Sequence, residues 1–264
     1  MKTSLIISTY NRPDALRLCL LSAIGQSRLP DEIIVGDDGS RPDTREAIDA
    51  IRPLTEVPVI HVWHPDQGFR LAMMRNKAVA ASSGEYIIET DGDVILHPDF
   101  VADHVAFAAR GHYCKGGRCN LGPALTAQLC TAGELRPIHP WTRGIESKPE
   151  NAIHCLPLAR WLAPRYRKGR EKALGCNMSF FRDDFYAING YDEFFEGWGG
   201  EDGDFGRRLN MLGLTKRHLK FAGLAFHLWH EDKYMQNKER NFMHSARPDA
   251  PMRVPDDRGA AKYL

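Results

Sequence analysis

The 264-residue chain lacks several features that mark common classes of protein. No apolar run approaches the roughly 20 residues that a membrane-spanning helix needs, and the one near the N-terminus is too short for a signal peptide. The formal net charge is only +1, with 35 Lys and Arg against 34 Asp and Glu, so no overall field favours nucleic acid as a partner. We therefore expect a soluble protein whose default location is the cytoplasm.

Other missing patterns disfavour three further kinds of site. The six cysteines form no Cys-x-x-Cys pair and show no zinc-knuckle spacing, which argues against a disulfide framework or a cysteine-based zinc site. The N-terminal half contains neither a Gly-x-Gly-x-x-Gly nor a Walker-type loop, so a dinucleotide dehydrogenase and a P-loop enzyme are disfavoured. If the protein binds phosphates, a metal and cationic side chains must hold them.

What is present is enough apolar sequence to bury a substantial core, since 43% of the residues are hydrophobic and 9% aromatic. The N-terminal half alternates β-rich runs with helical patterns, at residues 5–9, 15–24, 32–36, 44–51, 59–62, 70–81 and 86–88. This alternation predicts an α/β fold with a mostly parallel central sheet flanked by helices. Ligands of such sheets bind in the crevice at the carboxyl ends of the strands.

Two carboxylates lie where one of these strands is predicted to end. Asp91 and Asp93 are separated by a single glycine and stand between apolar pairs. Carboxylates spaced in this way can hold a hard divalent cation and the diphosphate that it bridges, although an Asp-Gly-Asp sequence after a strand is also common in turns. The polar residues 9–11 and 37–38 end two earlier strands, and parallel strands would bring them to the same rim.

A second informative stretch combines glycines, an aromatic residue and acids. Glu201 and Asp202 open a predicted helix, where acids favourably oppose the helix dipole, so capping is one interpretation. Capping does not explain Trp198, which stands beside three glycines and is suited to stacking on a sugar. His227 and His230 follow a later apolar strand, and their spacing allows one or both to ligate Mn²⁺ or Zn²⁺.

Three segments outside these motifs are less informative. Residues 116–158 are rich in Gly and Pro with poor periodicity and are expected to be irregular, with short helices at most. Residues 160–170 gather positive charge and aromatics, compatible with an anionic acceptor or a membrane surface and equally with a solvated loop. The polar tail at 245–264 is expected to be extended or partly disordered.

Five motifs, in this order, resemble those of the inverting family-2 glycosyltransferases of GT-A fold. They are IISTYNR at 6–12, VGDDGS at 35–40, GFRLAMMRN at 68–76, TDGD at 90–93 and GWGGED at 197–202. The last motif is similar to the acceptor-side segment of β-galactosyltransferases. The resemblance implies one GT-A domain with a nucleotide-sugar-binding α/β half at 1–110 and an acceptor-binding, catalytic-base half at 111–244.

The resemblance also implies the donor-side ligands. Asp93 would ligate Mn²⁺ or Mg²⁺ directly, and His227, His230 or both would complete the metal shell. Asp91 would bond the ribose or lie just outside the metal, while Arg75 would help to hold the nucleotide and its diphosphate. The nucleotide base would be bound by Thr9, Tyr10, Asn11 and either Asp37 or Asp38.

On the acceptor side the resemblance implies that Asp202 is the catalytic base. Glu201 would contact the acceptor or the donor sugar, and Trp198 and Gly200 would help to form the acceptor site. The implied reaction moves a hexose or N-acetylhexosamine from a UDP-sugar to a hydroxyl of a saccharide or lipid-linked saccharide. Surface polysaccharide or lipopolysaccharide assembly, with peripheral contact to the inner face of the cytoplasmic membrane, is the usual setting of similar enzymes.

Two other functions compete with this one. A sugar nucleotidyltransferase would need a Gly-rich nucleotide loop near the N-terminus, and residues 8–12 contain no glycine. A non-catalytic carbohydrate-binding protein of the same fold would be expected to have lost Asp93 or Asp202, and both are present. The chain also lacks the Gln-x-x-Arg-Trp motif and the membrane spans of polymerases in the family, which favours an enzyme that adds a single sugar.

Overall fold

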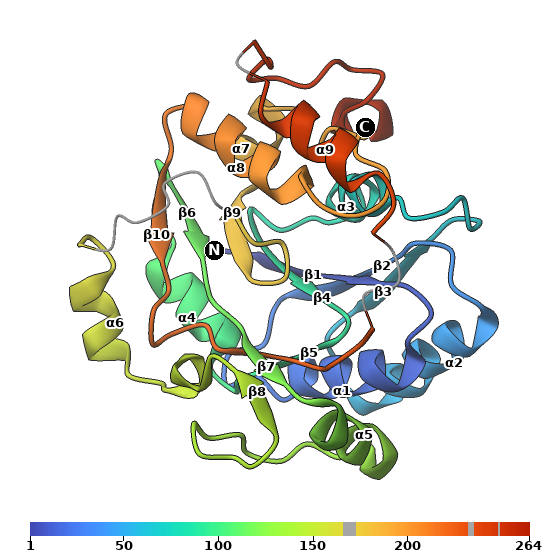
Figure 1. Cartoon of the computed structure of the whole chain (residues 1–264), viewed down its shortest axis with the longest axis vertical. Helices are drawn as coiled ribbons and strands as arrows, with labels where there is room; N and C mark the ends of the chain where they lie inside the picture. Colours follow the sequence, from blue (N-terminus) through green and yellow to red (C-terminus); the bar gives the residue numbers. More distant parts are fainter. Residues whose placement is uncertain (166–172, 232–234, 248) are drawn as a thin grey trace.

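The computed structural model describes residues 1–165, 173–231, 235–247 and 249–264. Its largest element is a seven-stranded sheet whose strands lie near the middle of the molecule (Figure 1). The strands are β1 Thr3–Thr9, β2 Glu32–Asp37, β3 Val59–Trp63, β4 Tyr86–Asp91, β6 His112–Lys115, β9 Met178–Phe181 and β10 Thr215–His218. They lie in the order β10-β6-β9-β4-β1-β2-β3.

The sheet is mostly parallel, as the alternating sequence pattern predicts. β1 pairs in parallel with β2 and β4, β2 with β3, and β6 with β10, whereas β9 runs antiparallel to both of its neighbours. The register sets Thr9 opposite Asp37, and Ser8 opposite Asp91. The carboxyl ends of β2, β1 and β4 therefore meet at one rim.

Helices cover both faces of this sheet (Figure 1). The α-helices of the described residues are α1 Pro13–Ile24, α2 Pro42–Ile51, α3 Leu71–Ala80, α4 Phe100–Phe107, α5 Pro123–Ala132, α6 Leu156–Leu162, α7 Arg182–Ala187, α8 Glu201–Met211 and α9 Lys238–Ser245. Short 3₁₀ helices lie at η1 Arg52–Leu54, η2 Pro149–Ala152 and η3 Ala260–Tyr263. None of the helices in the described parts of the chain has the length and apolar character needed to cross a membrane.

The core has one large cluster on each face of the sheet because side chains alternate along a strand. Leu5 and Ile7 of β1 pack in the cluster that includes Leu16 of α1. Ile6, which points to the opposite face, packs in the cluster that includes Phe205 of α8. All of β1 and β2 is buried, which explains why these strands appear in the sequence as continuous apolar runs.

A smaller sheet connects the end of β4 to the C-terminal half. Its strands are β5 Val94–Leu96, β7 Cys119–Leu121, β8 Ile145–Ser147 and β11 Ala225–His227, in the order β5-β11-β7-β8. β11 pairs antiparallel with β5, which sets His227 opposite Val94. This pairing brings the predicted histidine ligands next to Asp93.

The segment 116–158, expected to be irregular, contains more regular structure than its composition indicates. It holds β7, β8 and the ten-residue helix α5. The boundaries of α5 follow ordinary helix signals, with Pro123 in its first turn and Gly133 in the left-handed conformation at its end. Its buried residues are Leu125, Thr126 and Leu129.

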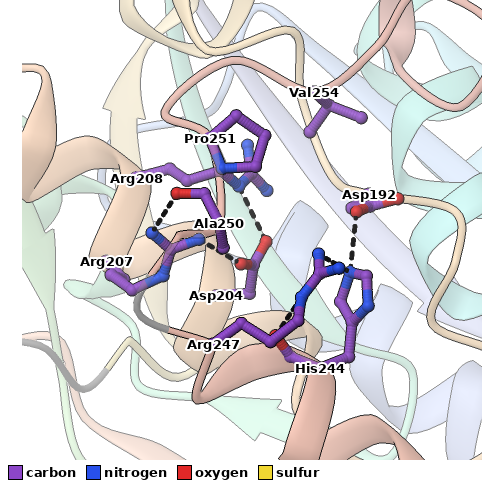
Figure 2. A pocket seen from close by; sticks show the side chains of 9 residues that line it. All are labelled: Asp192, Asp204, Arg207, Arg208, His244, Arg247, Ala250, Pro251 and Val254. Atoms are coloured by element: carbon purple, nitrogen blue, oxygen red, sulfur yellow. Dashed lines mark hydrogen bonds and ion pairs between the residues drawn. The ribbon is translucent and has the colours of Figure 1, made fainter.

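A polar cluster joins α8 to the C-terminal tail (Figure 2). Asp204 accepts hydrogen bonds from Arg207 at 2.8 Å and from Arg208 at 2.7 Å. Arg207 also donates to the carbonyl oxygen of Ala250 at 3.2 Å. Within the tail, Ala250, Val254 and Ala260 are buried. The described part of the tail is therefore packed on the core, where its polar and aperiodic sequence led us to expect an extended or partly disordered segment.

We expect Asp204→Ala to destabilise the protein by about 3–5 kcal/mol, because it leaves the buried guanidinium of Arg208 without its carboxylate. The side chain of Arg208 is 2% exposed and that of Asp204 is 4% exposed. Urea unfolding measures the decrease in the free energy of unfolding. The control is Asp183→Ala, which removes the 81% exposed partner of Arg110 and should cost less than about 1 kcal/mol. Equal losses in the two variants would contradict the argument.

Candidate active site

The rim formed by β1 and the turn after it carries three of the predicted nucleotide ligands. Thr9 is 8% exposed at the end of β1. Tyr10 donates its hydroxyl hydrogen to Asp66 at 2.8 Å, and the backbone N–H of Asn11 donates to the hydroxyl of Ser40 at 2.8 Å. The structure therefore brings these residues beside the loop that follows β2.

Asp37 and Asp38, between which the sequence does not decide, have different surroundings. Asp37 accepts the N–H of Ser40 at 2.8 Å, and its other oxygen lies 2.9 Å from Nε2 of His61. Both of its oxygens are thus engaged within the protein. Asp37 supports the turn after β2 and has little acceptor capacity left for a ligand.

Asp38 keeps one oxygen available. Its Oδ2 accepts the backbone N–H of Arg70 at 2.7 Å. Its Oδ1 is buried and accepts no hydrogen bond from the described residues, although Nε2 of His64 lies 3.0 Å away. Burial is the main cause that raises the pKa of Asp38, to about 7. An unsatisfied buried acceptor of this kind is a position where a ligand N–H can bind.

Arg75 of α3 is the centre of the predicted site. It donates to Asp202 at 2.7 Å and to Asp91 at 3.2 Å, and Glu201 lies 3.5 Å away. Its guanidinium also lies 5.3 Å from the centre of the Tyr191 ring. Burial alone would lower the pKa of Arg75, but the surrounding carboxylates raise it well above its ordinary value. Arg75 therefore joins the end of β4 to the start of α8.

Asp202 is held by a second hydrogen bond that the sequence did not reveal. Its Oδ2 accepts the backbone N–H of Gly175 at 2.8 Å. A Cβ at Gly175 would meet the guanidinium of Arg75 at 2.1 Å, so only glycine allows the backbone to come this close. The side chain of Asp202 is still 26% exposed. The carboxylate is thus fixed in place and accessible.

Glu201 stands beside Asp202 in the first turn of α8 and is more enclosed, with 12% of its side chain exposed. Burial, together with the neighbouring charge of Asp202, raises the pKa of Glu201 to about 7. Gly200 precedes the helix with a φ of 93°, in the region that favours glycine. Gly200 thus lets the chain turn sharply so that α8 begins with its two acids at the site.

Glu89 is a fourth acid near Arg75, and its part was not foreseen. It lies on β4, 1% exposed, and accepts the hydroxyl hydrogen of Tyr191 at 2.6 Å. Burial raises the pKa of Glu89 to about 7, although Arg75 opposes that shift. Tyr191 stands about a hundred residues later, and no local signal in the sequence links the two.

The second cluster contains the three predicted metal ligands, Asp93, His227 and His230. One ligand atom from each of them lies within 4.8 Å of the others. Nε2 of His230 is 3.4 Å, and that of His227 3.7 Å, from the carboxylate of Asp93. Arg12, whose contact was also unforeseen, donates to Asp93 at 2.8 Å.

The donor atoms of this cluster fit a divalent metal. Oδ1 of Asp93 is buried and has no hydrogen-bond partner among the described residues. Burial lowers the pKa of His227 to about 3, so its ring is neutral at physiological pH and can ligate a metal. A carboxylate with two imidazoles suits Mn²⁺ or another transition metal better than Mg²⁺.

Trp198 lies in the loop before α8. The ring is 38% exposed, with Nζ of Lys238 5.2 Å from its centre and the ring of Phe242 at 6.2 Å. The loop is anchored to the segment before α3, because the N–H of Gly197 donates to the carbonyl of Phe69 at 2.8 Å. The ring is therefore partly free to meet a ligand.

The predicted basic segment at 160–170 is only partly visible, since residues 166–170 lie outside the described residues. Trp161 of α6 is 57% exposed, and the guanidinium of Arg165 lies 4.6 Å from the centre of its ring.

Two family models match this chain. Residues 4–125 match the model of glycosyl transferase family 2, and residues 159–231 match one described as the N-terminal domain of galactosyltransferase. With the fold and the carboxylate-rich rim, these matches define a glycosyltransferase of the GT-A fold. Residues 4–125 are thus similar to glycosyl transferase family 2, which agrees with the resemblance seen in the motifs.

Curated relatives are distant and longer. Validoxylamine A glucosyltransferase of Streptomyces hygroscopicus subsp. limoneus is 28% identical over 233 residues, which cover 80% of this chain and 48% of that protein. Chondroitin synthase of Escherichia coli is 26% identical over 248 residues, which cover 85% of this chain and 34% of that protein. The chain thus spans about half or less of the length of these relatives.

Solved structures support the fold. The mannosyltransferase PcManGT from Pyrobaculum calidifontis, in complex with GDP-Man and Mn²⁺, matches with a TM-score of 0.58 at 16% identity, over 88% of this chain and 58% of that one. S. aureus TarS 1–349, in complex with UDP, matches with a TM-score of 0.57 at 18% identity, over 86% of this chain and 60% of that one. The predicted α/β fold of GT-A type is confirmed.

Glu89→Gln should make stability less dependent on pH. Because the pKa of Glu89 is raised from 4.5 to about 7, its contribution is present below pH 4.5 and is lost as the pH rises through 7. Gln still accepts the Tyr191 hydroxyl but cannot ionise, so the variant should gain roughly 3 kcal/mol over the wild type between pH 5 and pH 8. Urea unfolding at both pH values measures the gain.

The exposed Glu46 of α2 supplies the control, since Glu46→Gln should leave the pH dependence unchanged. A Glu89→Gln variant with the same pH dependence as the wild type would show that Glu89 is ionised in the folded protein.

Proposed function

We propose that this glycosyltransferase is metal-dependent and inverting, and that it moves a hexose or N-acetylhexosamine from a UDP-sugar to a saccharide hydroxyl. The observation that carries the proposal is the arrangement around Arg75. This one buried cation links Asp91, next to the Asp93–His227–His230 cluster, to Asp202 at the start of α8. A donor-diphosphate site and a base for the acceptor would then lie side by side.

The nucleotide would bind at the rim of β1 and β2. Asp38 has a free buried acceptor for the N–H of a pyrimidine base, whereas both oxygens of Asp37 are engaged. Thr9, Tyr10 and Asn11 would line the same pocket, and Asp91 would contact the ribose. UDP is the preferred nucleotide in this proposal because one free acceptor suits the single N–H of uracil, and TarS, a structural neighbour, binds UDP.

Asp93, His227 and His230 would hold Mn²⁺, or Mg²⁺ with lower preference. A bound divalent cation would offset the negative charge that develops on the diphosphate as it leaves. The proposal is supported by the donor set of the cluster and by the Mn²⁺ in the structure of the related mannosyltransferase. Arg12 adds positive charge on the same side, through its contact with Asp93.

Asp202 would act as the base. Arg75 and Gly175 each hold one of its oxygens, and the carboxylate remains accessible. It would accept the proton of the acceptor hydroxyl while that oxygen bonds to C1 of the sugar, and the bond from C1 to the diphosphate breaks on the opposite face. A single displacement of this kind inverts the anomeric centre. Glu201 would contact a sugar, and Trp198 with Gly200 would help to form the acceptor site.

The acceptor would be a saccharide or lipid-linked saccharide in surface polysaccharide or lipopolysaccharide assembly. This part of the proposal is supported by relatives such as chondroitin synthase, although the chain spans only a part of their length. An exposed Trp161 on α6 is compatible with peripheral contact at the inner face of the cytoplasmic membrane. A sugar nucleotidyltransferase is disfavoured because residues 8–12 contain no glycine, and a silent binding protein would not need both Asp93 and Asp202.

Asp202→Asn should keep UDP affinity and lower sugar transfer by about 10²–10⁴-fold, because Asn cannot accept the proton. Calorimetric titration with UDP and Mn²⁺, and turnover of the UDP-sugar that the wild type hydrolyses fastest, give the two quantities. The control is Asp183→Asn, which changes an acid in the first turn of α7 at the opposite end of β4. Normal transfer by Asp202→Asn would exclude it as the base.

His230→Ala should raise the Mn²⁺ concentration required for half-maximal activity by about 10–100-fold, since it removes one donor from the metal site. A chelator should abolish the activity of the wild type, and added Mn²⁺ should restore it. His112→Ala, which changes a half-buried histidine of β6 outside the cluster, serves as the control. An unchanged Mn²⁺ requirement in His230→Ala would remove His230 from the ligand set.

A further inference from the structure

A second group of potential metal ligands lies outside the proposed active site. His97, Asp99 and His154 each offer one ligand atom, and these atoms lie within 4.8 Å of one another. His97 follows β5, Asp99 precedes α4, and His154 lies between η2 and α6. Asp93 stands before β5 and His97 after it, so the two groups are at opposite ends of this strand. We propose that His97, Asp99 and His154 form a Zn²⁺ site.

The surroundings of His154 resemble the outer shell of a metal centre. Its Nε2 lies 2.9 Å from Oδ2 of Asp103, a carboxylate with 2% of its side chain exposed. Asp103 also accepts the backbone N–H of Gly223 at 2.7 Å, so its position is fixed. If Nε2 of His154 donates to Asp103, the lone pair is on Nδ1. A carboxylate that orients a histidine in this way is a common partner of metal-binding histidines.

The other two ligands are also oriented. Ser27 donates its hydroxyl hydrogen to Oδ1 of Asp99 at 2.6 Å, which leaves Oδ2 available. That oxygen lies 3.8 Å from Nδ1 of His97. Nδ1 of His97 accepts the backbone N–H of Asp99 at 3.1 Å, a contact that an ion bound at Nδ1 would replace. Oδ2 of Asp99 is therefore available to a cation, whereas at Nδ1 of His97 a cation would take the place of the N–H of Asp99.

The composition and exposure of the group favour zinc. The rings of His97 and His154 stack with centres 4.6 Å apart, so one ring would turn for both rings to ligate the same ion. The exposed fractions are 23% for His97, 41% for Asp99 and 26% for His154, which gives an ion a path from solvent and leaves room for water. Two imidazoles, one carboxylate and a water form a tetrahedral set that Zn²⁺ accepts readily, whereas Mg²⁺ and Ca²⁺ prefer oxygen.

Such an ion would connect segments that are far apart in the sequence. His154 belongs to the connection from η2 to α6, whereas His97 and Asp99 belong to the turn from β5 to α4. An ion bound by the folded protein stabilises it by mass action. Zinc bound there would therefore hold these two segments together, and the site stands independently of the function proposed above.

The test counts bound zinc in protein that lacks the active-site cluster. In an Asp93→Ala/His230→Ala background, equilibrium dialysis of the full chain against Zn²⁺ alone should show one bound equivalent. Adding His154→Ala should remove it, while adding His112→Ala, at a half-buried histidine of β6, should not. The proposal would be overturned if the Asp93→Ala/His230→Ala protein bound no zinc, or if adding His154→Ala left the bound equivalent of zinc in place.

If the His154→Ala protein does not fold, Asp103→Asn provides a second test of the zinc site. Asn retains an oxygen for the N–H of Gly223 but orients His154 less well, so zinc affinity should fall about 10–100-fold. Co²⁺ in place of Zn²⁺ gives a second reading, because a tetrahedral His–His–Asp site produces intense visible absorption that Asp103→Asn should weaken. An unchanged affinity and spectrum would show that Asp103 only supports the fold and that the site is not as proposed.

Discussion

The buried guanidinium of Arg75 is the interaction on which the rest of the site depends. The side chain of Arg75 is only 2% exposed, and a cation this deeply buried is stable only where nearby carboxylates compensate for its lost hydration. Its partners come from different parts of the chain, because Asp91 follows Arg75 by 16 residues and Asp202 follows it by 127 residues. The same constraint explains the glycine at 175, since a Cβ there would occupy the space of the guanidinium. One ion network therefore fixes the end of β4 and the start of α8 together.

The charges around Arg75 do not balance. Asp91, Glu201 and Glu89 stand near this one cation in addition to Asp202, and burial raises the pKa values of all three above their ordinary values. Like charges at close range favour the protonated form of some members of such a group. The resulting negative potential adjoins the Asp93 cluster, and it favours cations there. The electrostatics of the two clusters are thus linked, although their side chains have different partners.

The sequence predicted the elements that are long, periodic and covered on both faces. β1, β2 and β4 with α1 and α3 follow from continuous apolar runs and helical spacing, and their polar ends give most of the candidate ligands. The smaller sheet was only partly predictable, because an apolar strand was expected before His227 but three-residue strands such as β5 have no periodic signal. A family motif supplied Asp202, and the spacing of His227 and His230 indicated a metal site, whereas Gly175 and Tyr191 act only through tertiary contacts that no local pattern reveals.

The turn between Asp91 and Asp93 is held both by the ion network of Arg75 and by the pairing of β5 with β11. Arg75 holds Asp91 from one side, and the pairing of β5 with β11 brings His227 to Asp93 on the other. Gly92 keeps the turn against β1, since its N–H donates to the carbonyl of Ser8 at 2.7 Å and a Cβ at this position would meet Thr9 at 3.0 Å. A larger residue would push the turn away from β1 and move both carboxylates together. The spacing of two acids around one glycine is therefore a packing requirement as well as a chemical one.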